Sequence, residues 1–110
     1  IDCWATWCVP CMNGIEAMEP MKEQMKGLDV VFVYLTNETS QMDAWSEQVI
    51  RISGQHYRIK SDIWNKIPGL GAIPQYYLYD RQSKRVWETT GFGKETLEEI
   101  ETEINRVLEQ

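Results

Sequence analysis

The fold is decided by the stretch Trp7-Cys8-Val9-Pro10-Cys11, which follows a short, largely apolar run over residues 1–5. This pattern predicts a strand that leads into a helix beginning at the cysteine pair. The unpaired backbone N–H groups and the dipole at a helix N-terminus stabilise a thiolate at Cys8. Cys11 follows one helical turn later, close enough to attack a mixed disulfide at Cys8. The spacing therefore indicates a redox-active pair.

The same two cysteines could form half of a metal site, so the other ligands in the chain matter. A structural zinc site needs four ligands, usually Cys or His, and only Cys3 and His56 remain. The spacing Cys3-x4-Cys8-x2-Cys11 is also similar to one iron–sulfur pattern, but that pattern needs a fourth cysteine. Pro10 favours a helix start over a zinc knuckle. We therefore expect redox chemistry, with no bound metal and no other cofactor.

Size and composition predict one domain over residues 1–110. With 43% hydrophobic residues, the chain can build a core without disulfide or metal staples. Seventeen acidic and eleven basic residues give a net charge of −6, so nucleic acid and anionic membrane surfaces are not expected partners. No stretch approaches the ~20 apolar residues that span a bilayer. Because the sequence opens at Ile1, inside a predicted strand, we expect it to be the C-terminal part of a longer chain.

The residues after the cysteine pair predict a long helix and then a buried strand. Apolar residues recur at helical spacing to about Lys26, and Pro20 is expected to kink or interrupt this helix. The β-branched and aromatic run over 30–35 is typical of a strand buried on both faces. A second helix is expected next, capped by Thr39 or Ser40. The side chains expected to face inward from it are Met42, Trp45 and Val49.

The second half of the chain predicts a β-hairpin between helices. Residues 57–59 are expected to be extended, and Ser61 to cap a brief helix. The runs 75–79 and 85–90 predict two antiparallel strands, and an amphipathic helix is expected from Glu95 onward. The order β-α-β-α-α-β-β-α predicts a mixed sheet between helices, an α/β sandwich.

These motifs resemble those of thioredoxin-fold proteins. Residues 2–11, Asp-Cys-Trp-Ala-Thr-Trp-Cys-x-x-Cys, are similar to the family's active-site strand and helix start. Ile73-Pro74, just before a predicted strand, resembles the family's cis-proline loop. Gly91-Phe92-Gly93 resembles the glycine loop before its last helix. The Trp-Ala-Thr-Trp-Cys wording and the long segment that leads to Pro74 are most similar to the TlpA/ResA-like branch.

The resemblance implies a fold, a reaction and a setting. The implied fold is a thioredoxin-like three-layer α/β sandwich, a mixed central sheet flanked by helices, from which an N-terminal β-α element is missing here. The implied activity is that of a thiol–disulfide oxidoreductase that serves cell redox homeostasis; we expect it to reduce protein disulfides, with their oxidation or isomerisation as the alternatives. The implied partners are protein disulfide substrates and an upstream thiol electron donor. The implied location is extracytoplasmic, either periplasmic or membrane-tethered, with the cytoplasm as the alternative.

The same resemblance implies residue roles. Cys8 is the expected attacking thiol and Cys11 the resolving thiol. Asp2 resembles the buried aspartate beneath the cysteines of thioredoxins, where burial would raise its pKa and suit it to act as a general base. The alternative is an exposed carboxylate at a frayed terminus. Pro74 is expected to follow a cis peptide bond and to leave the Ile73 backbone free to pair with a substrate strand.

Other positions near the cysteines carry further expectations. Cys3 alternates with Asp2 along the strand and so points to the opposite face, where a buried inert thiol is expected and a regulatory thiol is the alternative. Gly14 stands where many ResA-like proteins carry an acidic residue. Phe92 is expected either at the substrate or in the core. The apolar rim expected to bind substrate comprises Trp7, Pro10, Ile73 and Phe92.

Two functions of other classes stay open from the residues alone. A redox-idle thioredoxin-like binding module would recognise a partner by strand addition beside Pro74. A copper(I) metallochaperone would hold a soft ion between the thiolates of Cys8 and Cys11. The complete Trp-Cys-x-x-Cys motif together with Pro74 favours the oxidoreductase.

Overall fold

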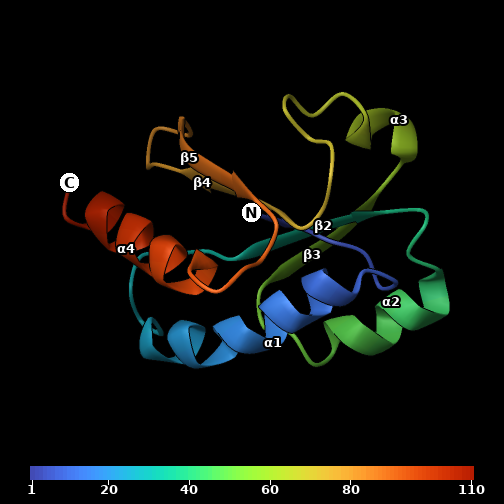
Figure 1. The fold of residues 1–110 in the computed structure, drawn as a ribbon, viewed down its shortest axis with the longest axis horizontal. Coiled ribbons are helices and arrows are strands. Elements are labelled where there is room, and N and C mark those ends of the chain that lie inside the picture. Colours follow the sequence, from blue (N-terminus) through green and yellow to red (C-terminus); the bar gives the residue numbers. More distant parts are fainter.

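A five-stranded mixed sheet, in the order β3-β2-β1-β4-β5, forms the middle layer of the protein (Figure 1). The structure is a computed structural model that describes residues 1–110. The central strand β1 pairs in parallel with β2 and antiparallel with β4, and β5 pairs antiparallel with β4. The strands are β1 (Asp2–Cys3), β2 (Val33–Asn37), β3 (Gln55–Ile59), β4 (Gln75–Tyr79) and β5 (Arg85–Thr90). The helices are α1 (Val9–Gln24), α2 (Met42–Val49), α3 (Ser61–Trp64) and α4 (Thr96–Leu108).

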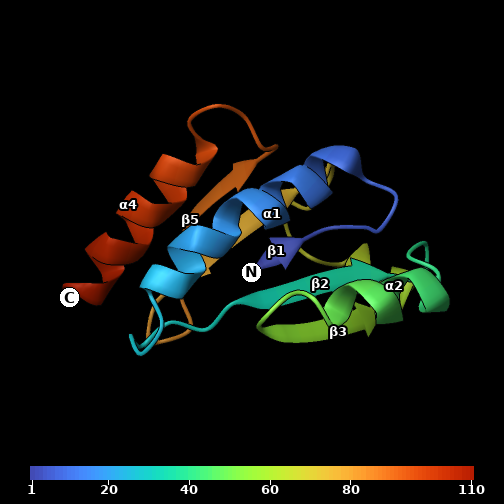
Figure 2. The ribbon, with the colours of Figure 1, turned by 90° about the horizontal axis from the view of Figure 1, so that it is seen from below.

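Three helices cover one face of the sheet and the short α3 lies on the other (Figures 1 and 2). Met18 and Met21 of α1 pack with Ile100 and Ile104 of α4 against Tyr76 of β4. On the opposite face, a smaller cluster joins Cys3, Trp64 and Tyr77. These layers confirm the predicted three-layer α/β sandwich, with one more strand, β3, than the predicted order contains.

The strand predicted over 30–35 begins later, at Val33, and continues to Asn37. A strand depends on its hydrogen-bonded neighbours, and β1 supplies them only from Asp2, which lies opposite Tyr34. Burial in β2 alternates: Tyr34 and Thr36 are buried, whereas Val33, Leu35 and Asn37 are half-buried. The prediction of a strand buried on both faces was therefore wrong in its bounds and only half right in its burial.

The predicted helix caps were wrong for α2 and α3. The N-cap residue of α2 is Gln41, and neither Thr39 nor Ser40 caps the helix. The Ser40 hydroxyl instead forms a hydrogen bond with Thr36 Oγ1 and accepts one from the Thr6 amide. Ser61 is the first residue of α3 rather than its cap, and its amide donates to Glu38 Oε1 at 2.9 Å.

Two expectations for the helix faces also changed. Met42 was expected to face inward but is 52% exposed, because α2 meets the core through Trp45, one turn further on. Pro20 does not interrupt α1. Proline has no N–H group, so the carbonyl of Glu16 has no amide partner. Because this turn of the helix is exposed, water can donate the missing hydrogen bond. No helix of the protein combines the length and apolarity needed to traverse a bilayer.

Candidate active site

A disulfide joins Cys8 and Cys11 at the N-terminus of α1. Cys8 is the N-cap residue, and the Cys11 amide donates to its sulfur at 3.3 Å. This amide is one of the unpaired donors that every helix start presents, so it also stabilises negative charge on Cys8 when the disulfide opens. Cys8 keeps 6% of its surface exposed and Cys11 none. Cys8 is therefore the more exposed cysteine of the pair, although it is less exposed than its predicted position near the surface suggests.

The loop before β4 lies against this disulfide. The Ile73–Pro74 peptide bond is cis, which confirms that prediction, and the Ile73 carbonyl oxygen lies 3.9 Å from Cys8 Sγ. The Pro74 carbonyl accepts the amide of Gly91 at 2.7 Å. The fold thus brings together the cysteine pair, the proline loop and the glycine loop, three motifs that are far apart in the sequence.

The predicted apolar rim is unevenly exposed. Trp7 is 61% exposed, and its indole N–H donates to Thr39 Oγ1 at 3.0 Å, which fixes the ring beside Cys8. Pro10 is exposed and Ile73 half-buried. Phe92 is half-buried and packs against Tyr76, so it is partly a core residue. A groove of about 150 Å³ lies between Trp7 and the proline loop, with Gly71 and Ile73 in its wall.

Asp2 is buried beneath the site, on the face of the sheet that α1 covers. Its cross-strand neighbours are Tyr34 and Tyr76, whose side chains lie on the same face. Neither carboxylate oxygen has a hydrogen-bond partner, and burial raises the pKa of Asp2 to about 7. A cavity of about 60 Å³, lined by Asp2 and otherwise by hydrophobic residues such as Met18, adjoins the carboxyl group. Asp2 is therefore buried, and the alternative of an exposed carboxylate at a frayed terminus is wrong.

Lys22 is a buried cation that the sequence analysis missed. It is 7% exposed, and its ammonium group donates to Tyr34 Oη at 2.6 Å, to the Ser53 carbonyl at 2.7 Å and to Glu19 at 3.1 Å. Its charge partly counters the effect of burial on the pKa of Asp2. The available signal was its position on the apolar stripe of α1, four residues after Met18.

The surroundings of Gly14 and Cys3 account for the small residue at position 14 and for the inert thiol at position 3. A Cβ atom on Gly14 would lie 2.5 Å from Tyr76 Oη and 3.0 Å from the Phe92 ring, so a larger residue fits there only if these aromatic side chains move. Cys3 is buried on the opposite face of β1 from Asp2, as predicted, and burial raises its thiol pKa to about 12. A thiol with this pKa stays protonated near neutral pH.

Comparison with known proteins gives few but consistent likenesses. No family model matches the chain. It is 23% identical over 112 residues to the thiol-disulfide oxidoreductase ResA of Bacillus thuringiensis (strain Al Hakam) and to that of Bacillus anthracis, a match that covers 97% of the chain. The chain spans only 61% of the length of these relatives.

One solved structure shares the architecture. It is the crystal structure of a protein assigned as the thiol:disulfide interchange protein DsbE from Chlorobium tepidum. The TM-score is 0.76 at 24% sequence identity, and the match covers 97% of this chain and 77% of that one. The likeness confirms the fold that the sequence predicted.

Proposed function

We propose that this thioredoxin-fold chain, which is similar to the TlpA/ResA-like proteins, is a thiol–disulfide oxidoreductase that reduces protein disulfides. The observation that carries the proposal is the Cys8–Cys11 disulfide at the start of α1, with the cis-Pro74 loop beside Cys8. The ResA relatives support it by their names.

The reaction is a two-electron exchange through a mixed disulfide. In the reduced protein, the Cys8 thiolate attacks one sulfur of a substrate disulfide, and the other substrate sulfur leaves as a thiolate. The Cys11 thiolate then attacks Cys8, forms the Cys8–Cys11 disulfide and releases the second substrate thiolate. The two leaving thiolates take up protons, and a dithiol donor reduces the protein again.

Asp2 is the proposed base for the second step. Cys11 is fully buried, which disfavours its thiolate, so its proton needs an acceptor nearby. Asp2 has a pKa of about 7 and two oxygens without partners. Its neighbour Tyr34 packs in the same hydrophobic cluster as Cys11. The carboxylate of Asp2 therefore suits a group that takes the Cys11 proton near neutral pH.

The substrate is proposed to bind along the proline loop. An extended chain segment would pair with the Ile73 backbone and rest against Trp7, Pro10 and the exposed edge of Phe92. The resemblance further supports an upstream thiol donor and an extracytoplasmic setting, periplasmic or membrane-tethered. It also supports the assignment of residues 1–110 as a single domain.

A redox titration with thiol counting by mass spectrometry tests the proposal. We expect a reversible couple of two thiols, Cys8 and Cys11, with Cys3 unchanged and a potential near or below about −220 mV, as a reductase needs. Cys8→Ser should abolish turnover of a protein disulfide, whereas Cys11→Ser should accumulate a mixed disulfide at Cys8. If no couple forms between these cysteines, the enzyme is excluded and the strand-binding module takes its place. Stoichiometric copper(I) uptake that competes with disulfide formation would instead favour the metallochaperone.

A further inference from the structure

The loop that carries Ile73 to the active site packs Ile67, Leu70 and Ile73 against the cluster of Cys3, Trp64 and Tyr77, but its middle contains two glycines. It connects α3 to β4 over residues 65–74 and contains Gly69, at a φ of +79°, and Gly71, around which there is open space. Glycine gives a chain more conformational freedom than any other residue. The position of Ile73 beside Cys8 therefore depends on this apolar packing together with the hydrogen bonds that hold the two ends of the loop.

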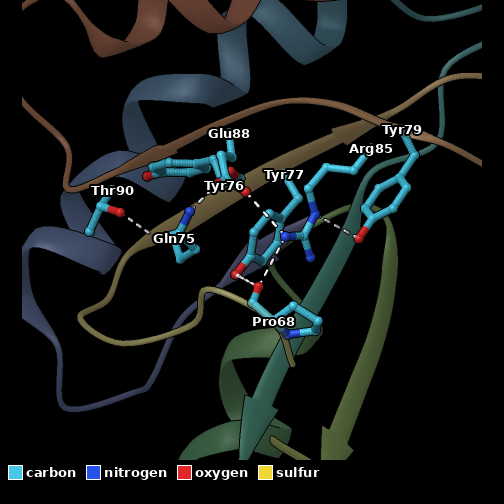
Figure 3. A network of polar contacts seen from close by, with 8 residues as sticks. All are labelled: Pro68, Gln75, Tyr76, Tyr77, Tyr79, Arg85, Glu88 and Thr90. Carbon is cyan, nitrogen blue, oxygen red and sulfur yellow. Dashed lines mark hydrogen bonds and ion pairs between the residues drawn. The ribbon is translucent and has the colours of Figure 1, made fainter. Parts of the chain in front are cut away.

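The end of the loop next to β4 is held by β5 and the residue after it. The Pro74 carbonyl accepts the Gly91 amide at 2.7 Å. The buried Gln75 side chain accepts a hydrogen bond from the Thr90 hydroxyl (Figure 3). These contacts fix Pro74 and Gln75 but do not involve Gly69 or Gly71.

At the other end, the hairpin is hydrogen-bonded to the loop through the carbonyl group of Pro68. It accepts a hydrogen bond from Arg85 Nη1 at 3.0 Å and another from Tyr77 Oη at 3.3 Å (Figure 3). Both donors belong to the β4–β5 hairpin, so the hairpin holds the loop from both ends.

Arg85 is itself held in place by the strands. Its Nε donates to Tyr79 Oη at 3.1 Å, and its Nη1 also lies 3.1 Å from Glu88 Oε2. The guanidinium carbon lies 3.9 Å from the centre of the Tyr77 ring. A planar guanidinium suits this set of partners because it can lie over a ring while its N–H groups point outward in its own plane, which an ammonium group cannot do.

We propose that Arg85 is a positioning residue for protein substrates: through Pro68 it holds the 68–73 loop so that Ile73 faces Cys8. The proposal rests on the proposed function. Arg85 does not touch either sulfur, so its contribution concerns a substrate that contacts the loop. A small disulfide that reaches Cys8 without the loop should not depend on Arg85.

The test compares Arg85→Met with wild type and with Arg81→Met. Arg81 belongs to the same hairpin but pairs with Asp29 on the surface, so it is a matched control. Two substrates are used, insulin disulfides and the small disulfide dithiobis(nitrobenzoate). Amide hydrogen exchange of residues 69–73 is followed by mass spectrometry in parallel.

For Arg85→Met we expect kcat/KM for insulin to fall roughly tenfold, the size of effect that loss of a charge-assisted hydrogen bond produces. The fall should come mainly from KM, and the small disulfide should react within about twofold of wild type. Exchange at 69–73 should accelerate. Tyr77→Phe removes only the weaker of the two donors to Pro68, so kcat/KM for insulin and exchange at 69–73 should change in the same direction as in Arg85→Met but by less. Arg85→Lys should retain more kcat/KM for insulin than Arg85→Met but less than wild type.

Three results would overturn the proposal. These are an Arg85→Met protein that matches wild type on insulin, an equal loss on both substrates with a lowered melting temperature, or unchanged exchange at 69–73. If the wild-type protein reduces neither substrate, the proposed function fails. Hydrogen exchange then still decides whether Arg85 holds the loop.

Discussion

Asp2 is a buried carboxyl group for which the fold provides no hydrogen-bond partner. Burial raises its pKa from 3.8 to about 7. Between these values the folded state binds more protons at Asp2 than the unfolded state, so the contribution of Asp2 to stability is lost as pH rises toward 7. A comparison of an Asp2 variant with wild type at two pH values measures this effect.

We therefore predict that Asp2→Asn gains stability relative to wild type as pH rises. Between pH 5 and pH 8, the difference in unfolding free energy between variant and wild type should grow by roughly 2–3 kcal/mol, from about 1.4 kcal/mol per pKa unit. Urea unfolding of the oxidised proteins measures this change. Asp43→Asn, at an exposed position, should track wild type at both pH values. A constant difference between Asp2→Asn and wild type would show that the pKa of Asp2 is ordinary.

At the scale of elements, α1 approaches β4 closely because Gly14 has no side chain. The nearest atoms are the Tyr76 hydroxyl and the Phe92 ring. Alanine would add about 1 kcal/mol of helix stability at an exposed position. At this buried contact, however, it must displace a rigid aromatic side chain.

We predict that Gly14→Ala lowers the unfolding free energy by about 1–2 kcal/mol, the usual cost of overpacking. Tyr76→Phe removes the hydroxyl, which has no hydrogen-bond partner, and should be neutral or slightly stabilising alone. The double variant should regain most of the loss, because the atom nearest to the new methyl group is gone. Denaturant unfolding of all four proteins completes the cycle. Additive effects of the two changes would contradict this account of the contact.

How well each element could be predicted depended on how local its signal is. The hairpin strands β4 and β5 have the predicted bounds, because alternation and a turn are properties of neighbouring residues. The caps of α2 were missed because Ser40 is engaged by Thr36 and Thr6, and the latter lies far away in sequence. In the site, the cysteine pair and the cis-proline were predictable from short motifs. Lys22 and Arg85 were not, because their partners are brought to them only by the fold.

At the scale of the whole molecule, the protein carries a net negative charge, while the groove at its site is uncharged. The net charge is −6, and the exposed side of α4 carries Glu98, Glu99 and the half-buried Glu101. The side chains that line the groove beside Trp7 are all uncharged. Approach of a substrate is therefore governed by the overall charge rather than by an ion pair at the site.

We predict that a lysine-rich peptide disulfide reacts with the reduced protein faster than a glutamate-rich peptide of the same length. The advantage should be roughly threefold to tenfold at low ionic strength, and it should shrink as salt shortens the screening length to about 3 Å at 1 M. Stopped-flow rates over a salt series measure it, with a neutral peptide as the control. A ratio that does not change with salt would point to a specific charged contact instead.

The burial of Cys3 against Trp64 and Tyr77 has one more consequence. An alkylating reagent added to the reduced, native protein can reach Cys8, which keeps some exposed surface, whereas Cys3 becomes available only when the central strand leaves the sheet. The mass of each molecule then shows whether that strand has opened since the reagent was added. Alkylation of Cys3 therefore reports opening of the central strand separately from any reaction at Cys8 and Cys11.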